Sequence, residues 1–199
     1  MIKTVIFDIG NVLVRFDYMP FVRGLLGNEE TVDRVNNAIW FTGLWNELDR
    51  GQDEDETLKK MIEAEPDYEK EIRLTFDRVG ECIFQEDYAV PWIEELKTRG
   101  YQVLYLSNYS EHTMRVNPGA LSFLDHMDGG VFSCYEKLVK PDPALFRVIL
   151  ERYELDPGEC VFIDDSEANI KAARSLGIKT ICFKDYKGAK DELEVYLAL

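Results

Sequence analysis

The chain has 199 residues, of which 46% are hydrophobic and 31% charged, a composition typical of a globular protein with a sizeable core. Its 38 acidic residues outnumber 23 Lys and Arg, giving a net charge of −15, and this sign repels nucleic acid and anionic lipid surfaces. The composition therefore argues against a disordered chain and against nucleic-acid or membrane partners.

No stretch of the sequence has the pattern of a signal peptide or the ~20 apolar residues of a membrane-spanning helix. The four cysteines (Cys82, Cys134, Cys160 and Cys182) form no C-x-x-C pair. The two histidines, His112 and His126, lack metal-binding spacing, and we expect both on the surface. We therefore expect a cytoplasmic protein with isolated, buried thiols and neither disulfides nor zinc.

Five short apolar runs predict the strands of a parallel sheet that is covered on both faces. They are Thr4 to Phe7, Gln102 to Leu106, Gly130 to Phe132, Cys160 to Ile163 and Thr180 to Phe183. Helical patterns alternate with the later runs, at Pro91 to Arg99, Pro143 to Tyr153 and Glu167 to Leu176. The alternation predicts an α/β fold with a Rossmann-like, doubly wound parallel sheet, whose functional groups collect beyond the carboxyl ends of the strands.

Residues 16–87 interrupt this alternation, because they contain several helical stretches and no comparable strand. We interpret them as a small α-helical cap domain, with residues 1–15 and 88–199 forming the core domain. The aromatic residues of the insertion are expected to build mainly a small core of its own, with one or two of them facing a cleft. They are Phe16, Tyr18, Phe21, Trp40, Phe41 and Trp45.

Polar residues stand where the strands end or a helix begins, which is the edge of the sheet where sites form. They are Asp8, Ser107, Asn108, Lys140, Asp164 and Asp165. Any one of these residues is also explained by a turn, a helix cap or an exposed loop. Only their joint arrangement indicates a functional site. Three converging carboxylates repel one another unless a cation compensates, which predicts an oxygen-rich Mg²⁺ site. Mg²⁺ implies phosphate, and an aspartate in this setting can attack phosphorus.

These motifs resemble those of the haloacid dehalogenase superfamily of aspartate-nucleophile phosphohydrolases, over essentially the whole chain. The four matching segments are Val5 to Leu13, Leu104 to Asn108, Lys140-Pro141 and Val161 to Asp165. The insertion resembles the family's cap domain, which closes over the cleft and selects the substrate.

The resemblance assigns a role to each of these polar residues. Asp8 would be the nucleophile, and Lys140 would neutralise both it and the phosphate. Ser107, Asn108 and Lys140 would hold the phosphoryl group. The resemblance places Mg²⁺ on Asp8, the Gly10 carbonyl and Asp165, with Asp164 in support.

Gly10 departs from the family pattern, because phosphatases of the family usually read D-x-D and use the second aspartate as acid and base. The run Asp8 to Val12, with the stretch Leu44 to Gly51, is similar to a bacterial branch that includes a glucose-1-phosphate phosphatase. The missing acid therefore does not imply an inactive enzyme. Asp17, Glu47 and Asp49 are cap carboxylates that we consider as replacements.

We expect a Mg²⁺-dependent phosphatase that hydrolyses a small phosphomonoester, such as a sugar phosphate, through an aspartyl-phosphate. One alternative is a catalytically degenerate member that binds a phosphorylated ligand. Another is a 2-haloacid dehalogenase, in which the Asp164-Asp165 pair would have no metal to hold. A response-regulator receiver is disfavoured because its acidic pair follows the first strand. The sequence leaves open the substrate, the oligomeric state and any phosphotransfer.

Overall fold

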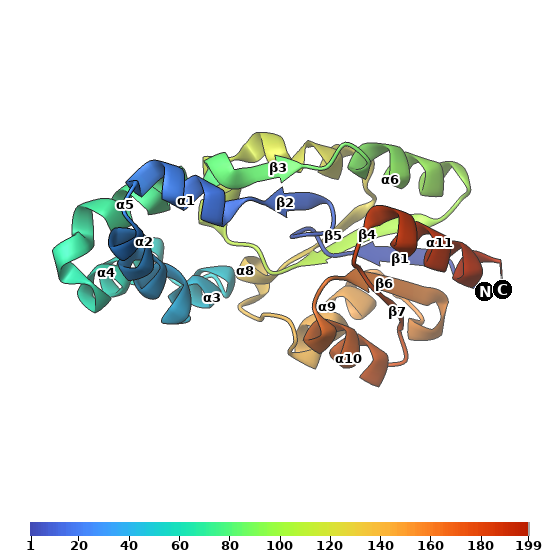
Figure 1. Cartoon of the computed structure of the whole chain (residues 1–199). Helices are drawn as coiled ribbons and strands as arrows, with labels where there is room; N and C mark the ends of the chain where they lie inside the picture. The colour runs from blue at the N-terminus through green and yellow to red at the C-terminus, as the bar shows by residue number, and fades with distance from the viewer. Residues whose placement is uncertain (199) are drawn as a thin grey trace.

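The computed structural model describes residues 1–198 and contains a five-stranded parallel sheet in the order β5-β4-β1-β6-β7 (Figure 1). The strands are β1 (Thr4–Phe7), β4 (Gln102–Ser107), β5 (Gly129–Phe132), β6 (Cys160–Asp164) and β7 (Lys179–Cys182). Each begins and ends within one residue of a predicted run, so the predicted α/β fold is confirmed. Because β1 is central and pairs with β4 and β6, the carboxyl ends of these three strands are neighbours.

Helices cover both faces of this sheet (Figure 1). One face carries α6 (Ala89–Thr98) and α11 (Tyr186–Leu197), and the other carries α9 (Pro143–Arg152) and α10 (Glu167–Ser175). Successive side chains of a strand point to opposite faces. Val5 and Phe7 of β1 therefore pack into the same hydrophobic cluster as α6 and α11, while Ile6 packs with α9 and α10.

Five helices between β1 and β4 lie beyond one end of the sheet (Figure 1). They are α1 (Tyr18–Leu26), α2 (Glu29–Asn36), α3 (Leu44–Asp49), α4 (Glu54–Ala64) and α5 (Glu69–Arg78), with a π-helical turn at Asn37–Phe41 and a 3-10 turn at Pro66–Tyr68. We call residues 18–78 the helical insertion. Asn28 and Asp53 cap α2 and α4 by accepting backbone N–H groups. One apolar stripe of each helix is buried, which holds the group together.

A two-stranded antiparallel ribbon joins the helical insertion to the sheet domain. It pairs β2 (Val14–Phe16) with β3 (Ile83–Gln85), and we predicted neither strand. In particular, β3 lies within residues 16–87, where we expected no strand. Neither strand is a continuous apolar run, because Arg15 interrupts β2 and Gln85 ends β3, which explains the omission. Because β2 precedes α1 and β3 follows α5, the chain enters and leaves the insertion side by side.

The remaining elements are short. They are α7 (Glu111–Val116), α8 (Ser133–Glu136) and 3-10 turns at Val79–Cys82, Pro118–His126 and Pro157–Glu159. All four cysteines are free; Cys82, Cys134 and Cys160 are buried as expected, whereas Cys182 is only partly buried. Across residues 1–198, none of the helices combines the length and the apolar character needed to cross a bilayer.

Candidate active site

The carboxyl edge of the sheet gathers the polar residues predicted from the strand ends. Asp8 directly follows β1, Ser107 is the last residue of β4, and Asp164 is the last residue of β6. Lys140 lies ahead of α9, whose first turn holds Pro143. The three strands are neighbours, so their terminal side chains meet where a doubly wound sheet forms its sites.

A buried lysine ties two of the carboxylates together. Lys140 Nζ lies 2.8 Å from Asp8 Oδ1 and 2.7 Å from Asp164 Oδ2, and the side chains of Lys140 and Asp164 are 1% and 0% exposed. Asp8 Oδ1 also accepts hydrogen bonds from Ser107 Oγ at 2.8 Å and from the Ile9 backbone N–H at 2.7 Å. Three donors on one oxygen fix the orientation of the Asp8 carboxyl group.

The electrostatics of this pair reflect burial and mutual attraction. Burial raises the pKa of Asp8 to about 7, although the nearby Lys140 ammonium opposes the shift. Burial also disfavours the charge on Lys140, but the carboxylates of Asp8 and Asp164 outweigh it and raise the pKa of this lysine. The two carboxylates thus favour the charged form of Lys140 inside the site.

A third carboxylate completes an oxygen-rich cluster. Oxygens of Asp8, Asp164 and Asp165 all lie within 4.8 Å of one another. Carboxylate oxygens in such a cluster are the hard donors that Mg²⁺ prefers, and a divalent cation would offset their repulsion. The donor set therefore fits the predicted ion.

Two asparagines that we did not predict orient this cluster. Asn169 Nδ2 donates to both oxygens of Asp164 at 3.0 Å, and Asn11 Nδ2 donates to Asp165 Oδ2 at 3.1 Å. Asn169 lies in the first turns of α10, so it faces back toward the strand that precedes the helix. Asn11 adopts φ 56°, a left-handed conformation that asparagine tolerates better than most residues. In the sequence, the available signals were the amide side chains themselves and, for Asn11, its place after Gly10 in a turn.

Asn108 lies in the site, but its side chain is already engaged. Asn108 Nδ2 donates to the Lys140 carbonyl at 3.0 Å, and Asn108 Oδ1 accepts the Lys140 N–H at 2.8 Å. This pair of bonds fixes the backbone of Lys140. The Asn108 amide thus positions the buried lysine.

A cleft of about 560 Å³ opens over the cluster, between the sheet edge and the helical insertion. From the sheet side it is lined by Asp8, Gly10, Asn11, Asn108, Lys140, Asp165 and Asn169. From the ribbon and the insertion it is lined by Phe16, Tyr18, Met19, Asn36, Trp40, Phe41, Trp45, Asn46 and Asp49. Five of the six predicted aromatic residues thus face the cleft, more than the one or two expected, because they lie at the edge of the core of the insertion.

Asp49 is the one carboxylate from the insertion in this cleft. It is 9% exposed, and burial raises its pKa to about 7, with a further rise from Asp8 and a smaller opposing effect of Lys140. A carboxyl group in this state can hold a proton near neutral pH. Asp49 therefore brings a proton-carrying group to the cleft that contains Asp8.

The backbone of Asp49 is fixed against the sheet domain. Its carbonyl accepts a hydrogen bond of 2.5 Å from Ser133 Oγ at the start of α8. Two residues later, Gly51 has φ 74°, and a Cβ there would lie 2.1 Å from the Cys134 carbonyl oxygen. Only glycine permits this approach, so the turn after α3 holds Asp49 in place.

The other two carboxylates that we considered for the acid–base role lie elsewhere. Asp17 pairs with Arg15 at 2.9 Å, and Glu47 lies 3.7 Å from Arg50, with both acidic side chains more than 40% exposed. Neither lines the cleft. Of the three cap carboxylates, the structure brings Asp49 alone to the site.

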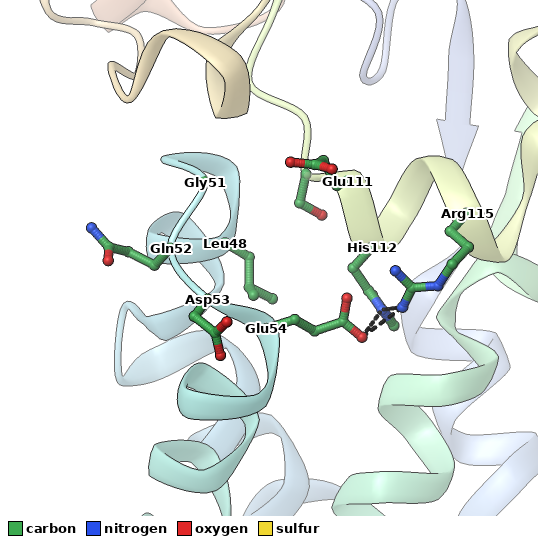
Figure 2. Close-up of a pocket in the computed structure, with 9 residues that line it drawn as sticks. Leu48, Gly51, Gln52, Asp53, Glu54, Glu111, His112 and Arg115 are labelled. Carbon is green, nitrogen blue, oxygen red and sulfur yellow. Dashed lines mark hydrogen bonds and ion pairs between the residues drawn. The ribbon is translucent and has the colours of Figure 1, made fainter.

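His112 is buried, so the expectation of a surface residue was wrong. Its Nε2 lies 2.9 Å from the Phe76 carbonyl. Its Nδ1 lies 3.1 Å from Glu54 Oε1, and Arg115 reaches the same glutamate oxygen at 2.6 Å (Figure 2). These contacts join α7 to α4 and α5 beside a second pocket of about 410 Å³. The long-range partners that bury His112 leave no trace in the local sequence. His126 is partly exposed, and its side chain pairs with Glu94 at the surface.

The metal-free protein is expected to unfold at a lower temperature at about pH 8 than at about pH 5.5. Asp8 and Asp49 have pKa values near 7 in the folded state against 3.8 in an ordinary setting, so folding binds protons. Stability conferred by these protons falls as the pH rises through that interval. Thermal unfolding in EDTA measures the difference, which Asp49→Asn should reduce. A higher unfolding temperature at pH 8 would contradict this expectation.

The model of the haloacid dehalogenase-like hydrolases matches residues 2–177, and the chain belongs to this family. A curated relative is the mouse acyl-CoA dehydrogenase family member 10, 38% identical over 109 residues, which is 53% of this chain. The chain spans 10% of the length of that relative and 12% of a rat bifunctional epoxide hydrolase 2.

Phosphatases are among the relatives that match over most of their length. A D-ribitol-5-phosphate phosphatase of Bacteroides thetaiotaomicron is 25% identical over 99% of both chains. A sesquiterpene phosphatase of Aspergillus oryzae is 24% identical over 88% of this chain and 87% of its own. A haloacid dehalogenase family enzyme from B. thetaiotaomicron, crystallised with magnesium and inorganic phosphate, shares the fold with a TM-score of 0.72 and 24% identity, over 94% of this chain and 98% of that chain. The protein is therefore a haloacid dehalogenase-like hydrolase with phosphatase relatives.

Proposed function

We propose that this protein is a Mg²⁺-dependent phosphatase that hydrolyses a small phosphomonoester through an aspartyl-phosphate on Asp8. The observation that carries the proposal is the buried Lys140, which holds Asp8 in a cluster of three carboxylates at the floor of a cleft. An ordinary structural ion pair has no need of the second and third carboxylates, whereas a phosphoryl group and its metal ion do.

In the first step, an Asp8 carboxylate oxygen bonds to phosphorus while the bond from phosphorus to the ester oxygen breaks. Lys140 offsets negative charge on the nucleophile and on the phosphoryl oxygens. Ser107 Oγ donates its proton to Asp8 in this structure. Because the hydroxyl can rotate, it could donate to a phosphoryl oxygen instead. Water then attacks phosphorus, and the bond between phosphorus and the Asp8 oxygen breaks. This step releases phosphate and restores the Asp8 carboxylate.

Asp8, the Gly10 carbonyl and Asp165 would hold Mg²⁺, with Asp164 supporting them. The ion would supply charge neutralisation for the nucleophile and the phosphoryl oxygens. Asn11 and Asn169 orient Asp165 and Asp164 for this purpose. We assign the Asn108 side chain to positioning Lys140, so a contact of Asn108 with phosphate would use its backbone N–H.

Asp49 is our proposed replacement for the acid that Gly10 cannot supply. It lines the cleft with Asp8, and its raised pKa lets it carry a proton near neutral pH. The proton would go to the ester oxygen as the alcohol leaves, and the resulting carboxylate would take a proton from the attacking water. Residues 16–87 would then act as a cap on the core formed by residues 1–15 and 88–199, and would contribute this group.

Two alternatives make different predictions. A 2-haloacid dehalogenase would release halide without a metal, and it gives no reason for Asp165 beside Asp8 and Asp164. A degenerate member would bind a phosphorylated ligand without turnover. The raised pKa of Asp49 in the cleft favours turnover, because a binding protein gains nothing from a buried acid there.

The test is phosphate release from a panel of phosphomonoesters, including glucose-1-phosphate and an aryl phosphate, with Mg²⁺ or with EDTA. We expect turnover with Mg²⁺ and a loss of at least about 100-fold in EDTA, since the carboxylate cluster would then repel the ester. Recovery on adding back Mg²⁺ is the control for damage by EDTA. Folded protein that binds Mg²⁺ yet hydrolyses no ester would overturn the proposal in favour of a binding function, and chloride release from a 2-chloroacid would favour the dehalogenase.

A further inference from the structure

The wall of the cleft opposite Asp8 is aromatic and rigid. Tyr18 and Trp40 pack edge to face with ring centroids 4.9 Å apart, and Trp40 and Trp45 lie 4.4 Å apart. Phe76 and His112 back this row from behind Trp45. Aromatic side chains have few rotatable bonds, so this wall presents an apolar surface to a ligand with little loss of conformational freedom.

Apolar groups also remain uncovered at the mouth of the cleft. Phe41 is 79% exposed and Met19 is 38% exposed, although both are large hydrophobic residues. Both come from the insertion, on the same side as Trp40. A cluster of this kind at the edge of a cleft marks a surface that meets an apolar ligand.

Polar atoms on the same wall lack partners. Asn36 is 7% exposed, and its Nδ2 faces Met19 Sδ at 3.7 Å, while its Oδ1 accepts no hydrogen bond within residues 1–198. The Tyr18 hydroxyl and Trp40 Nε1 are likewise buried and lie near each other, but neither makes a hydrogen bond of ordinary geometry in the described chain. A buried polar atom without a partner is costly, which is expected where a ligand supplies the missing group.

The charges of the cleft limit what this ligand can carry. Among its lining residues, all of them within the described chain, Lys140 is the only cation, and Asp8 and Asp164 already engage it. The wall therefore has no group for a second phosphate or a carboxylate. Its polar groups are Asn36, Asn46, the Tyr18 hydroxyl and Trp40 Nε1, set among aromatic rings. A sugar or polyol lying on these rings would leave several of its hydroxyls unpaired.

We propose that the alcohol part of the substrate is a largely apolar group, aromatic or isoprenoid, that lies on the Tyr18–Trp40–Trp45 wall and presents one hydroxyl or N–H to Asn36. This assignment rests on the proposed phosphatase activity and narrows its substrate class. The sugar phosphate expected from the sequence is then a poor substrate. The phosphate would lie over Asp8 and Lys140, and the apolar body would extend toward Phe41.

The test compares esters of primary alcohols, so that differences in leaving group are small. With Mg²⁺, kcat/KM is measured for 2-phenylethyl phosphate and citronellyl phosphate against glucose-6-phosphate and ribitol-5-phosphate. We expect the better apolar ester to exceed both polyol esters by at least about tenfold, mainly through KM. The aryl and isoprenoid arms distinguish the two sources of apolar alcohol. Equal or better hydrolysis of the polyol esters would overturn the inference and leave the phosphatase proposal intact, whereas no hydrolysis of any ester would overturn the phosphatase proposal.

Variants of the wall connect the preference to particular residues. Phe41→Ala removes an exposed ring, so the fold is retained, and we expect the ratio of apolar to polyol kcat/KM to fall about fivefold or more. Trp40→Ala should lower it further. Phe84→Ala, which removes a 45% exposed aromatic residue outside the cleft, is the matched control and should leave the ratio unchanged. An unchanged ratio in both Phe41→Ala and Trp40→Ala would overturn the assignment of the wall.

Asn36 is tested with 2-(4-hydroxyphenyl)ethyl phosphate, which adds one hydroxyl to the apolar ester. We expect its KM to be several-fold lower than that of 2-phenylethyl phosphate in the wild type, and equal to it in Asn36→Leu. The thermal unfolding temperature of Asn36→Leu should be unchanged or higher, because an unpaired buried amide is removed. Equal KM values for the two esters in the wild type would remove Asn36 from the proposed subsite.

Discussion

Asp8→Asn is expected to lower kcat/KM for every phosphomonoester by at least about 10,000-fold, because in the proposed mechanism the Asp8 carboxylate forms the covalent bond to phosphorus. Asparagine keeps the shape of the side chain and an oxygen that can accept from Ser107 and Lys140. Lys140 also keeps its contact with Asp164. The variant should therefore fold and retain phosphate binding while losing turnover, which steady-state kinetics and thermal unfolding together can establish.

Ser107→Ala is the matched comparison for this loss. It removes one of three donors on Asp8 Oδ1 and leaves Lys140 and the Ile9 N–H in place. We expect a loss of roughly 10- to 1,000-fold, the range for one stabilising donor, and thus less than for Asp8→Asn. Residual activity of Asp8→Asn at or above that of Ser107→Ala would contradict a nucleophilic role for Asp8.

Asp49→Asn is expected to produce a loss that depends on the leaving group. For esters of alkyl alcohols we expect kcat/KM to fall by roughly 100- to 10,000-fold, because the alkoxide must be protonated as it leaves. For 4-nitrophenyl phosphate we expect less than about tenfold, since the phenolate leaves without a proton. Kinetics on both ester types measure the contrast. An equal loss on both types would assign Asp49 to binding or structure instead of proton transfer.

Gly10 offers a rescue experiment for this role. A Cβ at Gly10 would meet no atom within 4 Å, and its φ lies outside the left-handed region, so a side chain fits there. Gly10→Asp restores the D-x-D pattern and should recover at least about tenfold of the alkyl-ester activity lost in Asp49→Asn. Asp17→Asn and Glu47→Gln are matched carboxylate controls outside the cleft and should change activity less than twofold or so. No recovery in a folded double variant would argue that Asp49 does not stand in for the missing acid.

The sequence located those features that depend on a single strand, namely the strands of the sheet and the polar residues at their ends. Apolar runs of three to five residues located all five strands of the sheet, because a buried parallel strand leaves a continuous local pattern. The positions of Asp8, Ser107 and Asp164 followed from the strand ends, since parallel strands share one carboxyl edge. Lys140 was predicted to reach this edge, and the structure places its ammonium between the two aspartates.

Contacts between segments that are distant along the chain could not be predicted from the sequence. Asp49 reaches the cleft because Ser133 and Gly51 fix the end of α3 against α8, a packing that no local period encodes. The bonds between the Asn108 amide and the Lys140 backbone could not be predicted locally, because the two residues are 32 positions apart. His112 was predicted at the surface, but Glu54 and Phe76 of the insertion pack against it and bury it. These features depend on how the helical insertion meets the sheet domain.

The most direct measurement is detection of the covalent intermediate. Wild-type protein with Mg²⁺ is mixed with a rapidly leaving aryl phosphate, quenched in acid within the first turnovers and digested for mass spectrometry. The account predicts one added phosphoryl group on the peptide that contains Asp8, absent in Asp8→Asn and accumulating further in Asp49→Asn, where activation of water is impaired. Phosphate release at full rate with no phosphoryl group on Asp8, or with the group on another residue, would contradict the proposed mechanism.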